Sequence, residues 1–261
     1  MITGLVALVF GLVVGSFLNV CIYRLPRGES VVWPGSRCPA CGHGLAWFEN
    51  VPVVAWLVLG GKCRTCRAAI PATYPLVEAA TGVLFVAVVS VYGLIPLLGV
   101  RLLFVCALVV LFVIDWQYQV LPDTITLPGV VVGLLASLFL PPGGVSALVG
   151  LAVGGLFPFF VAEGYFRLRG REGMGMGDFK MLAMVGAFLG WPLVWIVLIL
   201  SCVFGIVIGG GALLATRRGL ATRIPFGTFI AVAALVVVLA EVAVLRVSET
   251  VLDVYQTWVF G

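Results

Sequence analysis

Residues 102–116 read LLFVCALVVLFVIDW, an apolar run that ends in a carboxylate and a tryptophan. Similar runs of about 20 apolar residues recur along most of the chain, which is the pattern of membrane-spanning helices. Hydrophobic residues make up 62% of the 261 residues and charged residues only 10%, whereas soluble domains carry about 45–50% and about 25%. The sequence therefore predicts an all-α polytopic membrane protein.

The apolar runs divide into about eight predicted transmembrane helices. No basic residue precedes the first run and no small-residue cleavage site follows it, so we interpret it as a retained helix and not as a signal peptide. An even number of helices places both termini on one side. The predicted spans are 2–22, 74–93, 96–115, 124–140, 145–166, 178–190, 193–215 and 226–247.

The basic residues indicate which side faces the cytoplasm. Of the 15 Lys and Arg residues, only Arg101 and Arg246 fall near the side of the termini. By the positive-inside rule, the opposite side is cytoplasmic. The net charge of +4 is then a sign of topology and not of nucleic-acid binding, because no dense basic stripe is present. The cytoplasmic set is Arg24, Arg27, Arg37, Lys62, Arg64, Arg67, Arg167, Arg169, Arg171, Lys180, Arg217, Arg218 and Arg223.

The long cytoplasmic loop, 23–73, contains two C-x-x-C pairs, Cys38 with Cys41 and Cys63 with Cys66. Two such pairs can close a tetrahedral zinc site, which is normally structural when all four ligands are cysteines. The alternative is two disulfides, which a reducing cytoplasm disfavours. The only histidine, His43, is a possible substitute ligand, and its isolation excludes an H-E-x-x-H zinc protease.

Within the same loop, Trp47, Phe48 and the apolar run 51–59 are too short to span a membrane. We expect this stretch either to pack over the zinc unit or to lie on the membrane surface.

Carboxylates at the cytoplasmic ends of spans are the best candidates for chemistry. Asp115 ends its span, where the helix dipole disfavours negative charge, so helix capping does not explain it. Asp123 follows a proline and opens a span, so capping explains it. Asp178 also opens its span, so capping is an alternative for it, but it follows GMGMG, whose glycines supply mobility and close backbone approach beyond what a cap needs. The intramembrane acids Glu78, Glu163 and Glu241 are functional candidates by default.

Asp115 and Asp178 could form a dyad in which one carboxylate activates water and the other donates a hydrogen bond to a scissile carbonyl. The depth of Asp178 has two interpretations. The span from Asp178 to Gly190 measures only about 20 Å, so Asp178 could lie inside the membrane. If the helix continues past Pro192 instead, Asp178 lies at the interface.

Several stretches of the sequence, in order along the chain, resemble the motifs of one protein family. The chain resembles bacterial type IV prepilin peptidases, which are GxGD-type aspartyl proteases, from its first helix to its last. Thr228 follows the IPFG motif, at a position where the family often has proline, and we expect this difference to have little effect on function. The matching motifs are GSFLNVCIYRLP (15–26), WFENVPVVAWL (47–57), GGKCRTC (60–66), YPLVE (74–78), IDWQYQVLPDTITLP (114–128), GMGDFKMLAMVGAFLGW (175–191) and IPFG (224–227).

The resemblance implies an aspartyl endopeptidase of the bacterial inner membrane with its active site facing the cytoplasm. It implies that Asp115 and Asp178 are catalytic, and that the enzyme removes short basic leaders from prepilins and pseudopilins of type IV pili and type II secretion. Members with this cysteine loop also methylate the new N-terminus using S-adenosylmethionine. We expect substrate contacts at Gly175, Gly177 and Lys180. The implied regions are 1–22 (first helix), 23–73 (zinc-binding loop) and 74–261 (protease core).

Two other functional classes are weighed against this one. A transporter would place its acids near mid-span in paired halves, and no internal repeat is found here. A zinc-binding membrane scaffold would explain the cysteines but would leave Asp115 and the glycines unexplained.

Overall fold

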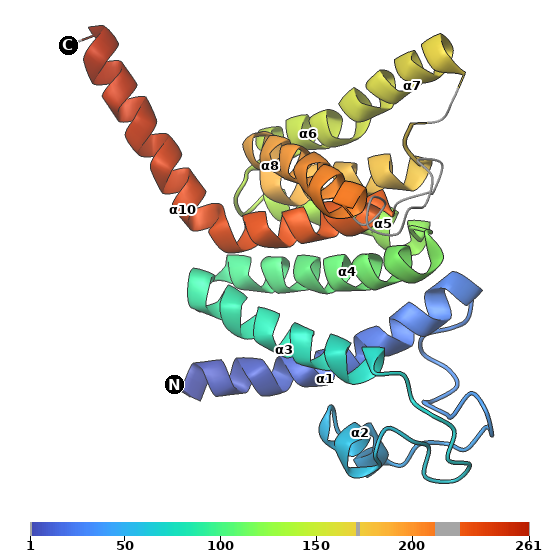
Figure 1. Cartoon of the computed structure of the whole chain (residues 1–261). Coiled ribbons are helices and arrows are strands. Elements are labelled where there is room, and N and C mark those ends of the chain that lie inside the picture. Colours follow the sequence, from blue (N-terminus) through green and yellow to red (C-terminus); the bar gives the residue numbers. More distant parts are fainter. Residues whose placement is uncertain (1, 171–172, 212–224, 261) are drawn as a thin grey trace.

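The chain folds into a bundle of long helices with one extended loop at its side (Figure 1). The computed structural model describes residues 2–170, 173–211 and 225–260, and side chains of the last helix up to residue 243. Arg171, Arg217, Arg218, Arg223 and Ile224 lie outside the described residues. The helices are α1 (Ile2–Arg24), α2 (Val54–Val58), α3 (Thr73–Tyr92), α4 (Pro96–Tyr118), α5 (Asp123–Ser137), α6 (Gly144–Leu151), α7 (Phe157–Arg169), α8 (Met176–Phe204) and α10 (Phe226–Phe260).

Six helical segments of the described chain are long and apolar enough to span a membrane. Helix suits this role because it satisfies every backbone N–H and C=O internally where no water is available. In one segment, α6 continues into α7 through the π-helical turn Ala152–Leu156. In another, α8 continues into the π-helical turn Gly205–Gly210. The described residues contain no β-strand, only two isolated bridges in the cysteine loop.

The α8 segment reverses direction at Gly190. Gly190 has φ 80° and ψ 173°, a conformation that interrupts the helix and favours glycine. Residues before and after it lie along the same stretch of the neighbouring helix: Phe159 contacts Phe179, and Phe157 contacts Trp195. We call Met176–Leu189 the first limb and Trp191–Phe204 the second limb of α8.

The two limbs separate the predicted spans 178–190 and 193–215, of which residues 212–215 lie outside the described residues, and the helix does not run straight past Pro192. The first limb has about 14 residues, or about 20 Å of helix, as expected. The predicted span 124–140 corresponds to α5, whose 15 residues are fewer than those of the six long segments. The described chain thus has six segments long and apolar enough to span a membrane, against about eight predicted, because α5 is shorter and the two limbs of α8 form one segment.

Glycines allow the first limb to pack directly on α6. A Cβ atom at Gly186 would lie 2.0 Å from the carbonyl oxygen of Gly150, and one at Gly154 would lie 2.2 Å from that of Leu182. In lipid, where no hydrophobic effect draws helices together, such backbone contact is a main source of association. Glycines serve α1 in the same way, since Gly11 and Gly15 touch the backbone of α3.

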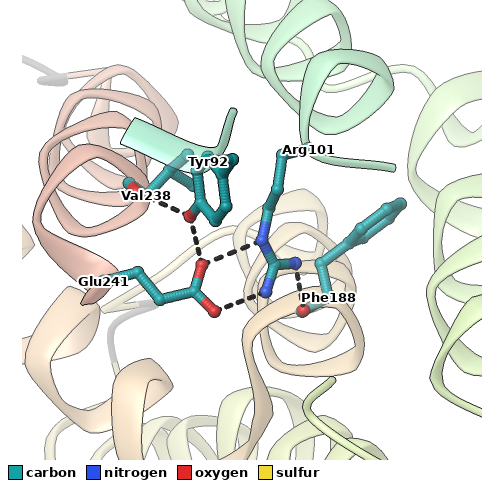
Figure 2. Close-up of polar contacts among 5 residues, drawn as sticks. All are labelled: Tyr92, Arg101, Phe188, Val238 and Glu241. Atoms are coloured by element: carbon teal, nitrogen blue, oxygen red, sulfur yellow. Dashed lines mark hydrogen bonds and ion pairs between the residues drawn. The ribbon is translucent and has the colours of Figure 1, made fainter. Parts of the chain in front are cut away.

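A buried ion pair joins the helices near the start of α4 (Figure 2). The Arg101 guanidinium on α4 donates from Nε and Nη2 to the Glu241 carboxylate on α10, over 2.8 and 2.6 Å. Its Nη1 donates over 2.7 Å to the carbonyl of Phe188, which has no helical partner because the helix is interrupted at Gly190 and the residue at i+4 is Pro192, which has no N–H. The Tyr92 hydroxyl reaches both Glu241 Oε2 and the Val238 carbonyl. Four helices therefore meet at one charge pair.

Breaking this pair should destabilise the protein. Glu241→Gln leaves the fully buried Arg101 without a carboxylate, and loss of one partner of a buried pair costs about 3–5 kcal/mol. We expect a clearly lower unfolding temperature for the purified variant in detergent. Glu163→Gln is the matched control, because Glu163 pairs with Arg167 at an exposed i,i+4 position, where a pair contributes about 0.3–0.5 kcal/mol. Equal shifts in the two variants would contradict the assignment.

Candidate active site and metal centre

Asp115 is buried at the C-terminal end of α4, only 5% exposed. Its Oδ2 accepts hydrogen bonds from the backbone N–H of Thr228, over 2.7 Å, and from the Thr228 hydroxyl, over 3.1 Å. Thr228 lies in the first turn of α10, which begins at Phe226. The carboxylate that is unfavourable for its own helix therefore caps the N-terminus of another, where the dipole favours negative charge.

Thr228 is the residue that sequence reasoning missed. We expected little consequence from a threonine in place of the family's proline, yet both of its hydrogen-bond donors reach Asp115. A proline has neither the backbone N–H nor a hydroxyl. The signal was present in the sequence as a departure from the motif, but no pattern linked position 228 to position 115.

Asp178 lies at the third position of α8 and is half-buried. Its Oδ2 accepts a hydrogen bond of 3.1 Å from the backbone N–H of Gly175, and its own N–H donates over 3.1 Å to the Gly175 carbonyl. Asp178 thus does contribute to the start of its helix, as half of a capping box. This contact uses one carboxylate oxygen, as does that of Asp115.

The two aspartates lie close enough for their charges to interact. Leu121, in the connection after α4, holds the surrounding backbone together. A Cβ atom at Gly177 or at Gly227 would lie 2.9 Å from the Leu121 side chain, so neither position has room for one. Packing against Leu121 therefore explains the glycine at 177. The connection after α4, the start of α8 and the start of α10 meet at this point beside the carboxylates.

Asp123 does not cap α5. The N-cap position is Pro122, and no side-chain cap is formed there among the described residues. Instead, both oxygens of Asp123 accept from the Lys180 ammonium at 2.8 Å. This pair ties the start of α5 to the first limb of α8, so the capping interpretation is wrong and Lys180 has a partner within the chain.

The remaining acids of the spans also have partners. Glu241 belongs to the buried pair of Figure 2, and Glu163 pairs with Arg167 on the surface of α7. Glu78 accepts the backbone N–H of Val53 over 2.7 Å and so ties the cysteine loop to α3. Each therefore has a structural explanation that the chain itself supplies.

The four loop cysteines form one cluster. The sulfurs of Cys38, Cys41, Cys63 and Cys66 all lie within 4.8 Å of one another, and none of the described cysteines forms a disulfide. The cluster could hold a metal ion, as its donor set indicates. Backbone N–H groups of Cys66 and Thr65 lower the pKa of Cys63 to about 6, which favours the thiolate that a metal requires.

The two halves of the cluster repeat one backbone pattern. Cys38 N–H donates to the His43 carbonyl and Gly42 N–H to the Cys38 carbonyl, each over 2.9 Å. Cys63 N–H donates to the Ala68 carbonyl over 2.8 Å and Arg67 N–H to the Cys63 carbonyl over 3.0 Å. Each C-x-x-C pair thus lies in a tight turn that presents both sulfurs to one point.

His43 lies outside the sulfur cluster, and its Nε2 is 3.2 Å from Glu49 Oε2. The Ala46 backbone N–H donates to the same oxygen over 2.8 Å. The hydrogen bond from Ala46 has the largest effect, and together with His43 it lowers the pKa of Glu49. The other oxygen, Oε1, is buried and has no hydrogen-bond partner among the described residues. An unpaired carboxylate oxygen in such a place is costly unless a ligand supplies a partner.

Glu49 lines a cavity of about 640 Å³ between the cysteine loop and the ends of α1 and α3. Four aromatic side chains also line it: Tyr23, Trp33, Trp56 and Tyr74. Next to the cavity, the Arg27 guanidinium lies 4.0 Å from the Tyr23 ring centroid and 3.3 Å from the Tyr118 hydroxyl. Since Tyr118 ends the helix of Asp115, this contact joins the cavity wall to the aspartate site.

Comparisons with known proteins match both the part of the chain that contains the cysteine loop and the part that contains the two aspartates. Residues 9–99 match the bacterial peptidase A24 N-terminal domain, and residues 102–210 match the type IV leader peptidase family. A prepilin leader peptidase/N-methyltransferase of Stutzerimonas stutzeri is 39% identical over 90% of each chain. One of Pseudomonas aeruginosa is 38% identical over 88% of this chain and 87% of its own. One of Myxococcus xanthus is 44% identical over 80% and 63%. No solved structure matches.

Removal of two cluster sulfurs should remove the bound metal. We expect about one metal ion per chain in the purified protein, because a closed four-sulfur site holds a single ion. The double variant Cys63→Ser/Cys66→Ser should carry little or none by elemental analysis. Cys202→Ser is the matched control, since Cys202 is exposed on α8 outside the cluster. Equal metal content in the two variants would show that the cluster is not the metal site.

Proposed function

Since the chain belongs to the type IV leader peptidase family, we propose that it is a membrane-embedded aspartyl endopeptidase that cleaves the leaders of prepilins and pseudopilins. The observation that carries this proposal is that the segments bearing Asp115 and Asp178 converge on Leu121: Gly177, which precedes Asp178, and Gly227, which lies against Asp115 Oδ2, both pack on its side chain. The two carboxylates come from different helices and are each held through Oδ2 by a backbone N–H at a helix N-terminus.

The dyad acts on a peptide bond through a bound water. One carboxylate takes a proton from the water, whose oxygen attacks the scissile carbonyl. The other, protonated, donates a hydrogen bond to the carbonyl oxygen, and the C–N bond then breaks as the leaving amine gains a proton. Contacts through Oδ2 fix both side chains before the substrate arrives. Less conformational entropy is then lost when the transition state forms.

The substrate enters in extended form along the glycine segment that precedes α8. Gly175, at the N-cap of α8, is exposed, and Gly177, in the first turn of α8, brings the backbone against Leu121 beside the dyad. Backbone without side chains leaves room for a second chain to lie alongside. Lys180 acts on the substrate indirectly, by fixing the first limb against Asp123.

Loss of either aspartate should abolish leader removal. A positioned acid or base contributes about 10²–10⁴-fold, so Asp115→Asn and Asp178→Asn should each lose at least about 100-fold. The purified protein is incubated with a prepilin and S-adenosylmethionine, and the product is weighed by mass spectrometry. Glu163→Gln is the control, since Glu163 pairs with Arg167 at an exposed position of α7 and has no role in the dyad. Continued cleavage by either dyad variant would rule out the assignment.

Thr228 is a positioning residue for Asp115. Thr228→Val keeps the shape but removes the hydroxyl donor, and a hydrogen bond to a charged group contributes about 1.5–3 kcal/mol. We expect kcat for leader cleavage to fall roughly ten-fold while KM stays unchanged. Thr228→Ser retains both donors and should restore the rate. A Thr228→Val variant with unchanged kcat, or a Ser variant as slow as Val, would contradict this role.

The relatives' names add an N-methyltransferase activity, and we assign it to this chain with S-adenosylmethionine as donor. The described cavity fits such a donor. Its volume of 640 Å³ lies within the usual range of about 300–1,000 Å³ for small-molecule sites. Aromatic rings and the unpaired Glu49 oxygen suit a sulfonium cation. When bound, the donor supplies the methyl group; in the experiment above, an added methyl mass on the cleaved product tests this activity.

Zinc is the metal that best suits the four-cysteine cluster, and its role is structural because no ligand position remains open. We assign 1–22 to the first helix, 23–73 to the zinc-binding loop and 74–261 to the protease core. The loop and both aspartates lie on the cytoplasmic side of the bacterial inner membrane, where the positive-inside rule places them. There they meet the basic leader of a prepilin.

A further inference from the structure

The outer face of the cysteine loop between Trp47 and Val58 is apolar. On α2, the side chains at the i, i+3 and i+4 positions Val54, Leu57 and Val58 are 55%, 64% and 80% exposed. Trp47 is 82% exposed, and residues 51–60 contain no charged residue. Exposed faces of loops in water are normally polar, so a contiguous apolar face indicates contact with something other than water.

This face lies alongside the ends of α1 and α3 and not beyond them. The Val53 N–H, just before α2, is bonded to Glu78, which lies five residues or about 7.5 Å inside the start of α3. Ser16 of α1 lines the same cavity as the loop, eight residues or about 12 Å inside Arg24. Figure 1 shows α2 beside the α1–α3 pair and not beyond the end of α1.

The loop is also amphipathic in the manner of an interfacial segment. Trp56 points inward, where its Nε1 donates to the Ile70 carbonyl over 3.0 Å. The Arg64 guanidinium lies 5.3 Å from the Phe48 ring at the edge of the apolar face. Apolar side chains flanked by tryptophan and by cations are the composition of segments that lie in the headgroup region.

We propose that α2 and the preceding turn Trp47–Asn50 lie in the cytoplasmic leaflet, with Val54, Leu57 and Val58 in contact with lipid acyl chains. The neighbouring helices also present apolar side chains near these ends, since Phe17 of α1 and Leu76 of α3 are 52% and 65% exposed. Lipid is therefore the occupant that the surroundings already supply. This inference does not depend on the peptidase activity.

The anchoring has a consequence for the cavity. The inner side of the same segment carries Glu49 and Trp56, which line the cavity. If its outer side is held by lipid, the cavity opens at the membrane surface and not into bulk cytoplasm. A substrate whose apolar segment is embedded in the bilayer then meets the cavity at its own depth.

Photocrosslinking in lipid nanodiscs tests the proposal on the full chain. Benzoylphenylalanine is introduced separately at three exposed valines: Val58, Val83 in the middle of α3, and Val32 in the loop that binds the Arg24 guanidinium at the end of α1. Lipid adducts are counted by mass spectrometry after irradiation. We expect adducts at positions 58 and 83 to exceed those at position 32 several-fold, although Val58 and Val32 are similarly exposed, at 80% and 84%.

The proposal is overturned if position 58 gives no more lipid adduct than position 32. It is equally overturned if position 58 links mainly to a second copy of the chain or, with prepilin added, to prepilin. Metal content of each variant shows whether the loop has kept its fold. If the Val58 variant has lost the metal, a variant at Leu57 replaces it, because Leu57 lies on the same face of α2.

Discussion

Two polar contacts fasten α4 to α10, one at each end of the pair. At one end the Arg101 guanidinium binds Glu241, and at the other the Asp115 carboxylate binds Thr228. These positions are 14 residues apart in α4 and 13 in α10, a distance of about 20 Å along either helix. In a lipid environment apolar side chains give little register between helices, whereas unpaired charges are expensive. The register of the central helix pair therefore depends on these contacts.

The first limb of α8 depends on the same framework. Gly190 interrupts the helix and frees the Phe188 carbonyl, which Arg101 then binds. Glycines at 150, 154 and 186 let this limb approach α6 at backbone distance. The limb that Arg101 holds at its far end carries Asp178 at its near end, where the preceding residue Gly177 packs on Leu121 beside the site of Asp115. The short span thus becomes understandable as a means of setting the depth of one aspartate.

Both aspartates have a structural contact and a proposed chemical role, and these do not exclude each other. Each contact uses Oδ2 and a backbone N–H at a helix N-terminus. A carboxylate fixed in this way loses little further freedom on binding substrate, which is what acid–base chemistry at a defined position requires. The cysteine loop is likewise fixed by contacts outside itself. A metal, Glu78 and lipid would each hold one part of a segment too small to form its own core.

The sequence by itself determined the helical membrane class, the spans, the cysteine cluster and the choice of Asp115 and Asp178 as candidates. These depend on hydropathy, spacing and motif, which are local properties of the chain. Tertiary structure alone decided the pairings: Arg101 with Glu241, Asp123 with Lys180, and Asp115 with Thr228. Asp123 was misinterpreted as a cap, and Thr228 was expected to matter little, for one reason. Each of these two side chains takes its partner from another helix, and that partner is separated from it in sequence by 57 residues in one case and 113 in the other.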